Sequence, residues 1–193
     1  MSIFININYA RVLTKRKFKI LSYIILYKVV VFTKWIGKKN RIIPKLIIKD
    51  LGFKYAFGQH SGVTDDTKDF YELPRFPINE TYGQLERFEL ILKTIPLKIK
   101  SITPTEKYIN DANNPPDVII EFLDQIKNIK LLNCYSNELN SWRKSKIEYL
   151  DNFKIRIKLV GKFTTERGRI NCSLREPDGS WRWLGMQFVV AEL

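Results

Sequence analysis

The second half of the chain alternates apolar and polar residues with a period of two. Ile155 and Ile157 flank Arg156, for example, which gives the segment one apolar face, as in a half-buried strand. Asp178-Gly179 separates the last two such segments and is a strong hairpin signal. Short strands at this spacing predict an antiparallel β-sandwich over residues 97–193. The predicted strands are 97–103, 118–123, 129–135, 146–150, 153–159, 168–173 and 181–190.

The stretch before these strands is rich in glycine and proline. Residues 58–62 read Gly-Gln-His-Ser-Gly and contain the single histidine of the chain, and prolines then extend residues 73–80. Glycine and proline at this density indicate a backbone held in special conformations rather than a plain helix. We therefore expect candidate functional residues in residues 51–88.

Helical spacing flanks this stretch on both sides. Apolar residues over 46–51 precede Gly52, a helix stop, and residues 53–57 are typical of a strand. A helix followed by glycine and a strand is an αβ half-unit of the kind that packs on a mostly parallel sheet or barrel. A second helix is predicted over residues 82–94, with Leu85, Phe88 and Leu92 on its apolar face.

The positive charge of the chain is concentrated at its N-terminus. The net charge is +13, yet residues 1–54 hold thirteen lysines and arginines against one acidic residue, Asp50. The remainder is nearly balanced, so the charge does not indicate a nucleic-acid-binding domain. For the basic segment 1–44 three interpretations stay open: a signal or membrane anchor over Phe18–Ile36, a surface helix, and a nucleic-acid arm. Lys28 interrupts the apolar run and disfavours the first.

Three separated motifs carry a resemblance to a known family. They are KLIIKDLGFKYAFGQHSG from Lys45, YELPRFPINETYGQLERF from Tyr71, and RINCSLREPDGSWRWLGMQFVV from Arg169. In this order they resemble the C-terminal part of bacterial polysaccharide deacetylases with a NodB-homology domain, in the subgroup that ends in a β-domain. The resemblance covers residues 45–193.

The resemblance implies an α+β fold, in which a C-terminal remnant of a deacetylase-like (β/α) barrel precedes an antiparallel β-sandwich. The implied parts are the basic segment 1–44, an αβ portion over 45–96 and the sandwich over 97–193. The implied function is hydrolysis of the N-acetyl amide of amino-sugar polymers, and we expect a truncated fragment that is inactive alone. The alternatives are a non-catalytic carbohydrate-associated module and a basic nucleic-acid or membrane-surface binder.

The catalytic motifs of that family are absent from this sequence. Its members carry Thr-Phe-Asp-Asp and His-x-x-x-His motifs that supply a base and metal ligands, whereas one histidine cannot form a two-histidine site. We therefore predict no catalytic residue, no metal ligand and no cofactor in this chain. A zinc-like divalent metal is expected in the full-length family, and a complementary chain would have to supply the missing half. Whether the chain is an enzyme is left open.

Gln59, His60 and Arg75 are the candidate substrate-binding residues, and the expected partner is an amino-sugar polysaccharide rather than nucleic acid. The His60 imidazole would face a cleft at a strand end or lock its own turn. Arg75 would pair with a carboxylate at the cleft or fasten the end of the domain.

Two further expectations concern the β-domain. Trp181 and Trp183 bracket Arg182 in one strand, so both indoles share a face, which is a sugar-stacking platform or the sandwich core. Members of the family are exported, so the resemblance implies a cell-envelope or exported location. Export permits a disulfide between Cys134 and Cys172, and two separate buried thiols are the alternative.

Overall fold

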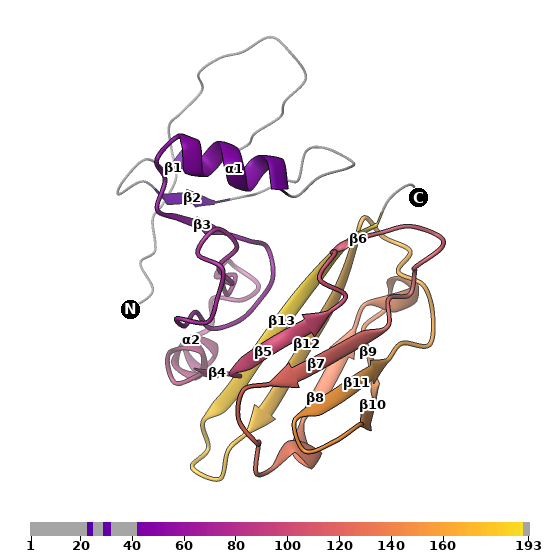
Figure 1. Ribbon diagram of the computed structural model, residues 1–193. Coiled ribbons are helices and arrows are strands. Elements are labelled where there is room, and N and C mark those ends of the chain that lie inside the picture. Colours follow the sequence, from indigo (N-terminus) through magenta and orange to yellow (C-terminus); the bar gives the residue numbers. More distant parts are fainter. Residues whose placement is uncertain (1–22, 25–28, 32–41, 191–193) are drawn as a thin grey trace. The chain divides into compact units, whose positions relative to one another are not determined.

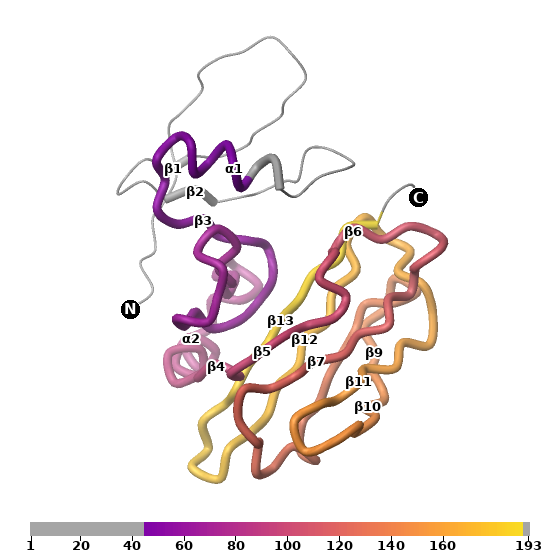
Figure 2. The backbone as a smooth tube through the Cα atoms, viewed as in Figure 1, coloured from indigo at the N-terminus to yellow at the C-terminus, as the bar shows by residue number. Residues whose placement is uncertain are grey.

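The computed structural model describes residues Tyr23–Ile24, Val29–Val31 and 42–190. The chain divides into two compact units, each taken here by itself (Figures 1 and 2). Unit 1 comprises residues 1–59 and 68–74, and unit 2 comprises residues 60–67 and 75–193. Unit 2 therefore contains the whole β-rich part of the chain, together with a piece of the glycine-rich and proline-rich stretch.

Unit 2 contains a six-stranded sheet and a four-stranded sheet. The larger sheet runs in the order β4-β13-β12-β8-β9, with β6 pairing on β13 beyond β4. Neighbours in it are antiparallel, except that β4 and β6 run parallel to β13. Its strands are β4 (Ile95–Pro96), β6 (Tyr108–Ile109), β8 (Asn133–Ser136), β9 (Arg143–Lys144), β12 (Arg167–Arg175) and β13 (Trp181–Val190).

The smaller sheet is antiparallel throughout and runs in the order β10-β11-β7-β5. Its strands are β5 (Ile99–Thr103), β7 (Val118–Phe122), β10 (Lys146–Tyr149) and β11 (Lys154–Lys158). Short 3-10 helices, η1 (Ile129–Leu131) and η2 (Glu138–Asn140), precede and follow β8. Helix α2 (Leu85–Leu92) lies before β4.

The two sheets bury one common hydrophobic core. Alternate residues of β7 and β11 face alternate residues of β8, β12 and β13, as the period of two requires. Every second residue along β12, from Gly168 to Leu174, is buried. The largest fully buried side chains of this core include Phe163, Phe188, Leu97, Ile109, Ile120, Ile155, Ile157, Ile170 and Leu174.

Strands β12 and β13 form the longest pairing of the sheet, with a continuous register from Arg167↔Val189 to Arg175↔Trp181. Asp178 and Gly179 turn the chain between them, as the sequence predicted. Gly179 has a φ of 84°, a conformation that glycine adopts at little cost. The Asp178 carboxylate accepts hydrogen bonds from the Ser180 amide and hydroxyl, at 2.9 and 2.7 Å. The predicted hairpin is confirmed.

Gly168 is needed on the inner face of β12 because an aromatic ring lies directly against it. A Cβ atom at this position would be 2.3 Å from the ring of Phe163, closer than real contacts allow. Phe163 in turn stacks on Phe188, with ring centroids 6.1 Å apart. The glycine between Arg167 and Arg169 thus makes room for the core, while the arginines on either side of it face outward.

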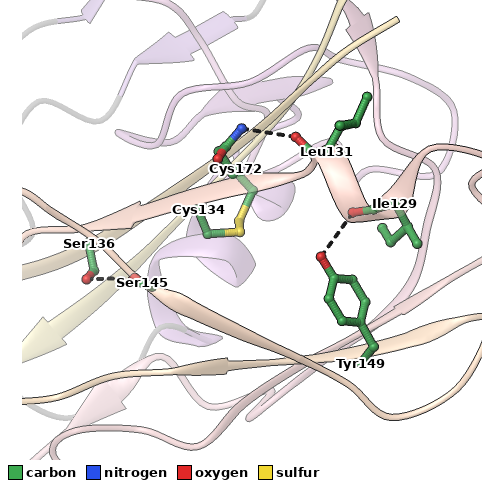
Figure 3. Close-up of a disulfide and its surroundings, with 8 residues drawn as sticks. Ile129, Leu131, Cys134, Ser136, Ser145, Tyr149 and Cys172 are labelled. Atoms are coloured by element: carbon green, nitrogen blue, oxygen red, sulfur yellow. Dashed lines mark hydrogen bonds between the residues drawn. A yellow bond between two sulfur atoms is a disulfide. The ribbon is translucent and has the colours of Figure 1, made fainter.

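A disulfide joins Cys134 of β8 to Cys172 of β12 within this core (Figure 3). The two residues are direct cross-strand partners with Cα atoms 4.0 Å apart, and both are fully buried. The bond closes a sequence separation of 38 residues. It therefore ties the middle of the six-stranded sheet together across two strands that are distant in sequence.

Unit 1 contains a small sheet in the order β1-β2-β3 and one helix. The elements are β1 (Tyr23–Ile24), β2 (Val29–Val31), α1 (Ile42–Asp50) and β3 (Tyr55–Phe57). Ile48 and Ala56 are buried together, with Phe53 and Tyr71 packed against them. Lys45 binds both Asp69 and Glu72, at 2.6 and 2.7 Å. This cluster is small compared with the core of unit 2.

The predicted fold class is wrong, because no remnant of a (β/α) barrel is present among the described residues. Helices α1 and α2 are short and isolated. Strand β3 has three residues and pairs parallel only with β2 and, through a single bridge, with Leu73. The helix–glycine–strand pattern was real, but such a pattern is local and does not create the series of parallel strands that a barrel needs. The chain is mostly β-sheet.

The predicted apolar faces of the helices are mostly exposed, and Ile48 is the residue of the first face that is buried. Leu46, Ile47 and Leu51 of the first helical pattern are exposed, and no residue of α2 is buried. In the β-domain, the predicted strand over 129–135 begins instead with η1 and becomes β8 only at Asn133. The described pieces of the basic segment 1–44 are the strands β1 and β2 and the start of helix α1 at Ile42.

Replacing Gly168 with alanine should lower the free energy of unfolding by about 1–3 kcal/mol, because the new methyl group overlaps the Phe163 ring. Urea denaturation followed by circular dichroism measures the change. Ser173→Ala, on the opposite face of the same strand, is the control and should change stability by less than about 0.5 kcal/mol. Equal effects from both variants would contradict this account of the core.

Removing the disulfide by the double substitution Cys134→Ala and Cys172→Ala should destabilise the protein by about 3–4 kcal/mol, given the length of loop that it closes. The loss is measured as a lower urea midpoint of the variant. The same shift should follow reduction of the unmodified protein with dithiothreitol. A midpoint that reduction leaves unchanged would show that the bond does not form in solution.

Candidate functional site

The outer face of the six-stranded sheet points away from the hydrophobic core and carries polar and aromatic side chains. Registry places Arg167 opposite Val189, Arg169 opposite Gln187 and Ser173 opposite Trp183. These residues alternate with the buried ones, so they share one face. We call this surface the outer face. Its residues in β12 and β13 are Arg167, Arg169, Asn171, Ser173, Arg175, Trp181, Trp183, Gly185, Gln187 and Val189.

The segment after Leu73 crosses this face and adds a third arginine. The backbone N–H of Arg75 donates to the His60 carbonyl at 3.0 Å. The next residue, Phe76, meets Trp183 edge to face with ring centroids 5.5 Å apart. The charge of Arg75 acts on Arg167, which stands two residues before Arg169 in β12, and we call these three residues the arginine cluster.

The cluster is electrostatically unfavourable as it stands. Burial, followed by the positive charge of Arg167, lowers the pKa of Arg75 from its usual value. The pKa of Arg169 is lowered for the same two reasons, in the same order, while Tyr82 acts in the opposite direction. Arg167 repels each of the other two half-buried guanidinium groups, and an anion bound beside them would reduce this repulsion.

Within the described residues, no carboxylate forms a salt bridge with any member of the arginine cluster, and the Nε atom of Arg169 is buried without a hydrogen-bond partner. Two other arginines of the same domain are paired. Arg182 binds Glu176, and Arg156 binds Asp117 at 3.0 Å. The cluster therefore presents three arginines that have no carboxylate partner among the described residues, unlike Arg156 and Arg182.

Tyr82 extends the cluster toward helix α2. The side chain of Arg87 lies over the Tyr82 ring, 5.0 Å from its centroid, and the Arg87 Nε atom is also buried without a hydrogen-bond partner. The phenol supplies a hydrogen-bonding group next to Arg169. The site thus combines guanidinium donors with one hydroxyl, a set suited to an oxyanion.

Asn137 fixes the backbone on which Arg167 and Arg169 stand. Its side chain donates to the Arg167 carbonyl at 2.9 Å and accepts from the Arg169 N–H at 2.6 Å, and its own N–H donates to the Arg169 carbonyl at 3.1 Å. The side-chain amide continues the pairing of β12 beyond the end of β8. The first residues of strand β12 are thereby held in place.

Gly185 lets the segment around Ser61 lie directly on the outer face. A Cβ atom on Gly185 would be 2.1 Å from the Ser61 carbonyl oxygen. Gly62 forms a bridge with Leu184 beside it. The carbonyl of His60 is the group that receives the Arg75 N–H. The absence of a side chain at position 185 therefore helps to bring the arginine-bearing segment onto the sheet.

The three candidates from the sequence lie in different settings. His60 and Arg75 are half-buried neighbours in unit 2, joined through the backbone bond, and Gln59 belongs to unit 1. Sequence reasoning missed Arg167 and Arg169. Their signal was present, because the two arginines flank Gly168 in a segment with a period of two, which places them together on the solvent side of a predicted strand.

The two tryptophans lie on the outer face rather than in the core cluster. Trp181 and Trp183 are both half-buried. Trp183 packs on Phe76, and its indole N–H is buried without a hydrogen-bond partner. Arg182 between them points to the other side and binds Glu176 and the Pro96 carbonyl. The shared face that alternation predicted is present.

Comparison with known proteins gives weak likenesses. No family model matches the chain, and no curated protein matches it. Among solved structures, PcoC, a methionine-rich copper resistance protein from Escherichia coli, matches with a TM-score of 0.36 and 14% identity, over 50% of this chain and 99% of that one. The selenomethionine form of PcoC gives a TM-score of 0.35 and 13% identity, over 48% of this chain and 98% of that chain.

CopC from Methylosinus trichosporium OB3b matches with a TM-score of 0.36 and 9% identity, over 48% of this chain and 91% of that chain. Likeness at this level is too low to carry a function from those proteins to this chain. Within the described residues, no group of three or more His, Cys, Asp or Glu side chains is arranged so that it could hold a metal ion.

The predicted membership of the deacetylase family is wrong. No family model matches the chain, and the residues that the structure describes lack the barrel remnant on which the prediction depended. The predicted deacetylase function is overturned with it, as is the carbohydrate-associated alternative. The expectation of a zinc-like metal, which came from the same family, is wrong on the same grounds. The motifs that suggested the family are short, and here they occupy different structural settings.

The structure also bears on location. Disulfides persist in oxidising environments, so the Cys134–Cys172 bond agrees with an exported or cell-envelope protein. None of the helices in the described ranges has the length and apolar character needed to cross a membrane. The candidate signal or anchor at Phe18–Ile36 lies largely outside the described residues, of which this run contains only β1 and β2.

Substituting Asn137 with alanine should lower the free energy of unfolding by about 1–3 kcal/mol, because the Arg169 amide and the Arg167 carbonyl lose their side-chain partner. Hydrogen exchange at the Arg169 amide should also become faster, which localises the effect. The control is Asn152→Ala, an exposed loop asparagine, which should leave both quantities unchanged. Loss of stability without faster exchange at Arg169 would contradict the role given to Asn137.

Proposed function

We propose that this chain contains a binding domain of an exported or cell-envelope protein that recognises a compact anionic group at the arginine cluster. The observation that supports this proposal is the arginine cluster of Arg75, Arg167 and Arg169. These side chains are half-buried and form no salt bridge in the part of the chain that the structure describes. A buried charge without a partner is costly, so such an arrangement is expected where a ligand supplies the partner.

Guanidinium chemistry favours an oxyanion as the ligand. Each guanidinium presents planar N–H donors that match the spacing of oxygens in a carboxylate, phosphate or sulfate. Arg167 and Arg169 stand on one strand, two residues apart, and so project to the same side. Arg75 closes the group from a separate segment, and Tyr82 adds a hydroxyl. The arrangement would hold one small anion from several directions.

The rigid surroundings support a binding role. The strand that bears Arg167 and Arg169 is paired along its whole length, fastened by Asn137 and joined to β8 by the disulfide. Recognition groups on rigid elements lose little conformational entropy when they bind a ligand. Two of the residues expected from the sequence belong to this proposal. Arg75 would donate to the anion, and the His60 carbonyl positions Arg75 by accepting its backbone N–H.

The test is isothermal titration of the full chain with inorganic phosphate, sulfate and pyrophosphate at low ionic strength. Removing two charges by Arg167→Gln and Arg169→Gln should weaken binding of the best of these anions at least about tenfold, since charge-assisted hydrogen bonds to the anion are lost. Binding should also weaken as the salt concentration rises. Nuclear magnetic resonance of the arginine Nε–H groups should show shifts for Arg75, Arg167 and Arg169.

The control variant is Lys146→Gln with Lys158→Gln, which removes two positive charges from the four-stranded sheet. It should bind the anion as the unmodified protein does. An equal loss in the control would indicate only a general charge effect and overturn the proposal. Binding of oligonucleotides but of none of the small anions would also overturn it, because that result requires an extended polyanion.

A further inference from the structure

One end of the sandwich in unit 2 exposes a group of apolar side chains. Five apolar or aromatic residues lie there on three loops, each exposing between 39% and 59% of its surface. We call this group the apolar tip. It consists of Leu123, Leu131, Tyr149, Leu150 and Phe153.

Hydrogen bonds bring these three loops to the same end. The Phe122 amide donates to the Phe153 carbonyl at 2.8 Å, and the Leu123 amide donates to the Lys98 carbonyl at 3.0 Å. The Tyr149 hydroxyl meets the Ile129 carbonyl in η1 at 3.4 Å, as Figure 3 shows. These bonds make neighbours of three segments, namely the end of β7, the β10–β11 hairpin and η1.

The tip is rigid enough to keep its apolar side chains outside. The hairpin is closed by the Leu150 amide, which donates to the Lys154 carbonyl at 3.0 Å, and the Asp151 carboxylate accepts from the Phe153 amide at 2.6 Å. In η1, the Leu131 amide donates to the Asn128 carbonyl at 2.8 Å. These bonds fix the backbone that carries Leu150, Phe153 and Leu131, whose side chains are exposed.

Lysines accompany the apolar tip. Lys127 and Lys130 are exposed beside Leu131, and neither forms a salt bridge within the described ranges. Lys98 makes only a long contact of 3.8 Å with the exposed Asp124, and Lys154 lies 3.9 Å from Glu121. Lys127 and Lys130, next to exposed apolar side chains, are complementary to a surface that is apolar below and anionic at its boundary, whereas the exposed Asp124 and Asp151 of the same end are not.

We propose that the apolar tip docks the domain on an anionic lipid surface. Leu131, Leu150 and Phe153 would enter the boundary between headgroups and acyl chains, while Lys127 and Lys130 would bind lipid phosphates. Tyr149 suits the same boundary, because its ring is apolar and its hydroxyl is polar. Loop tips that protrude separately fit a deformable surface, and the unpaired lysines favour an anionic one.

This proposal is independent of the arginine cluster, which lies on the outer face of the six-stranded sheet. The full chain also contains a basic N-terminal segment, so the test must report on the tip itself. Asn152→Cys in the hairpin is labelled with an environment-sensitive fluorophore, and Ser141→Cys, which is at the opposite end of β10, is labelled as the control. Both kinds of vesicle contain phosphatidylcholine with brominated lipids, and one of them also contains phosphatidylglycerol.

The label at position 152 should be quenched on vesicles that contain phosphatidylglycerol, and the label at position 141 should not. Quenching at both positions, or at neither, would overturn the proposal, because the tip would then have no special contact with the lipid. The double substitution Leu131→Ser and Phe153→Ser should reduce quenching at position 152 at least about tenfold, since two apolar side chains no longer leave water.

Two further variants separate the sources of binding. Val160→Ser with Trp142→Ser removes exposed apolar side chains away from the tip and should leave quenching at position 152 unchanged. Lys127→Glu with Lys130→Glu should abolish the preference for phosphatidylglycerol. Concentration-dependent self-association that Leu131→Ser abolishes, without lipid quenching, would mean that the tip binds a second copy of the chain and would overturn the proposal.

Discussion

The pairing of β12 with β13 is the constraint on which the rest of unit 2 depends. The register is continuous over nine residue pairs, so the two strands present a single inner face and a single outer face. The inner face supplies Ile170, Cys172 and Leu174 to the core. The outer face supplies Arg167 and Arg169 to the candidate site. A slip of one residue would exchange these two faces, burying the arginines and exposing the core.

Side chains secure this framework where the strands end and backbone partners run out. Glu138 is fully buried and accepts hydrogen bonds from Ser136 and from the amides of Val160 and Gly161, which joins the end of β8 to the β11–β12 connection. Asn114 makes a two-way pair with the backbone of Phe163. Buried polar groups satisfied in this way fix loops that hydrophobic packing alone would leave undefined.

The arginine cluster has no carboxylate partner among the described residues. Elsewhere in the same domain, Arg156 and Arg182 lie beside carboxylates that balance their charge. Repulsion between Arg167 and its two neighbours opposes folding, so the core and the disulfide must offset it. Local conflict of this sort, in an otherwise consistent structure, is characteristic of positions kept for binding rather than for stability.

Local sequence signals predicted individual strands and turns, but they also suggested a larger architecture that the structure does not have. The period of two gave the strands of the sandwich, and Asp178-Gly179 gave its hairpin, because both depend on alternation and turn chemistry over a few residues. The same kind of local signal, a helix followed by Gly52 and a strand, also suggested a barrel that does not exist. Short motifs from a family could not correct this error, since they report neighbouring residues and not which distant segments meet.

The sequence by itself determined the alternation in β12 that places Gly168 toward one side and Arg167 and Arg169 toward the other. It also determined the separation of the basic N-terminus from the balanced remainder. Only the tertiary structure decided that Arg75 joins those arginines, and that Cys134 faces Cys172. It decided as well that three distant loops gather their apolar residues at one end. The physical reason is that strand pairing and core packing act between residues far apart in the chain, and no local pattern encodes them.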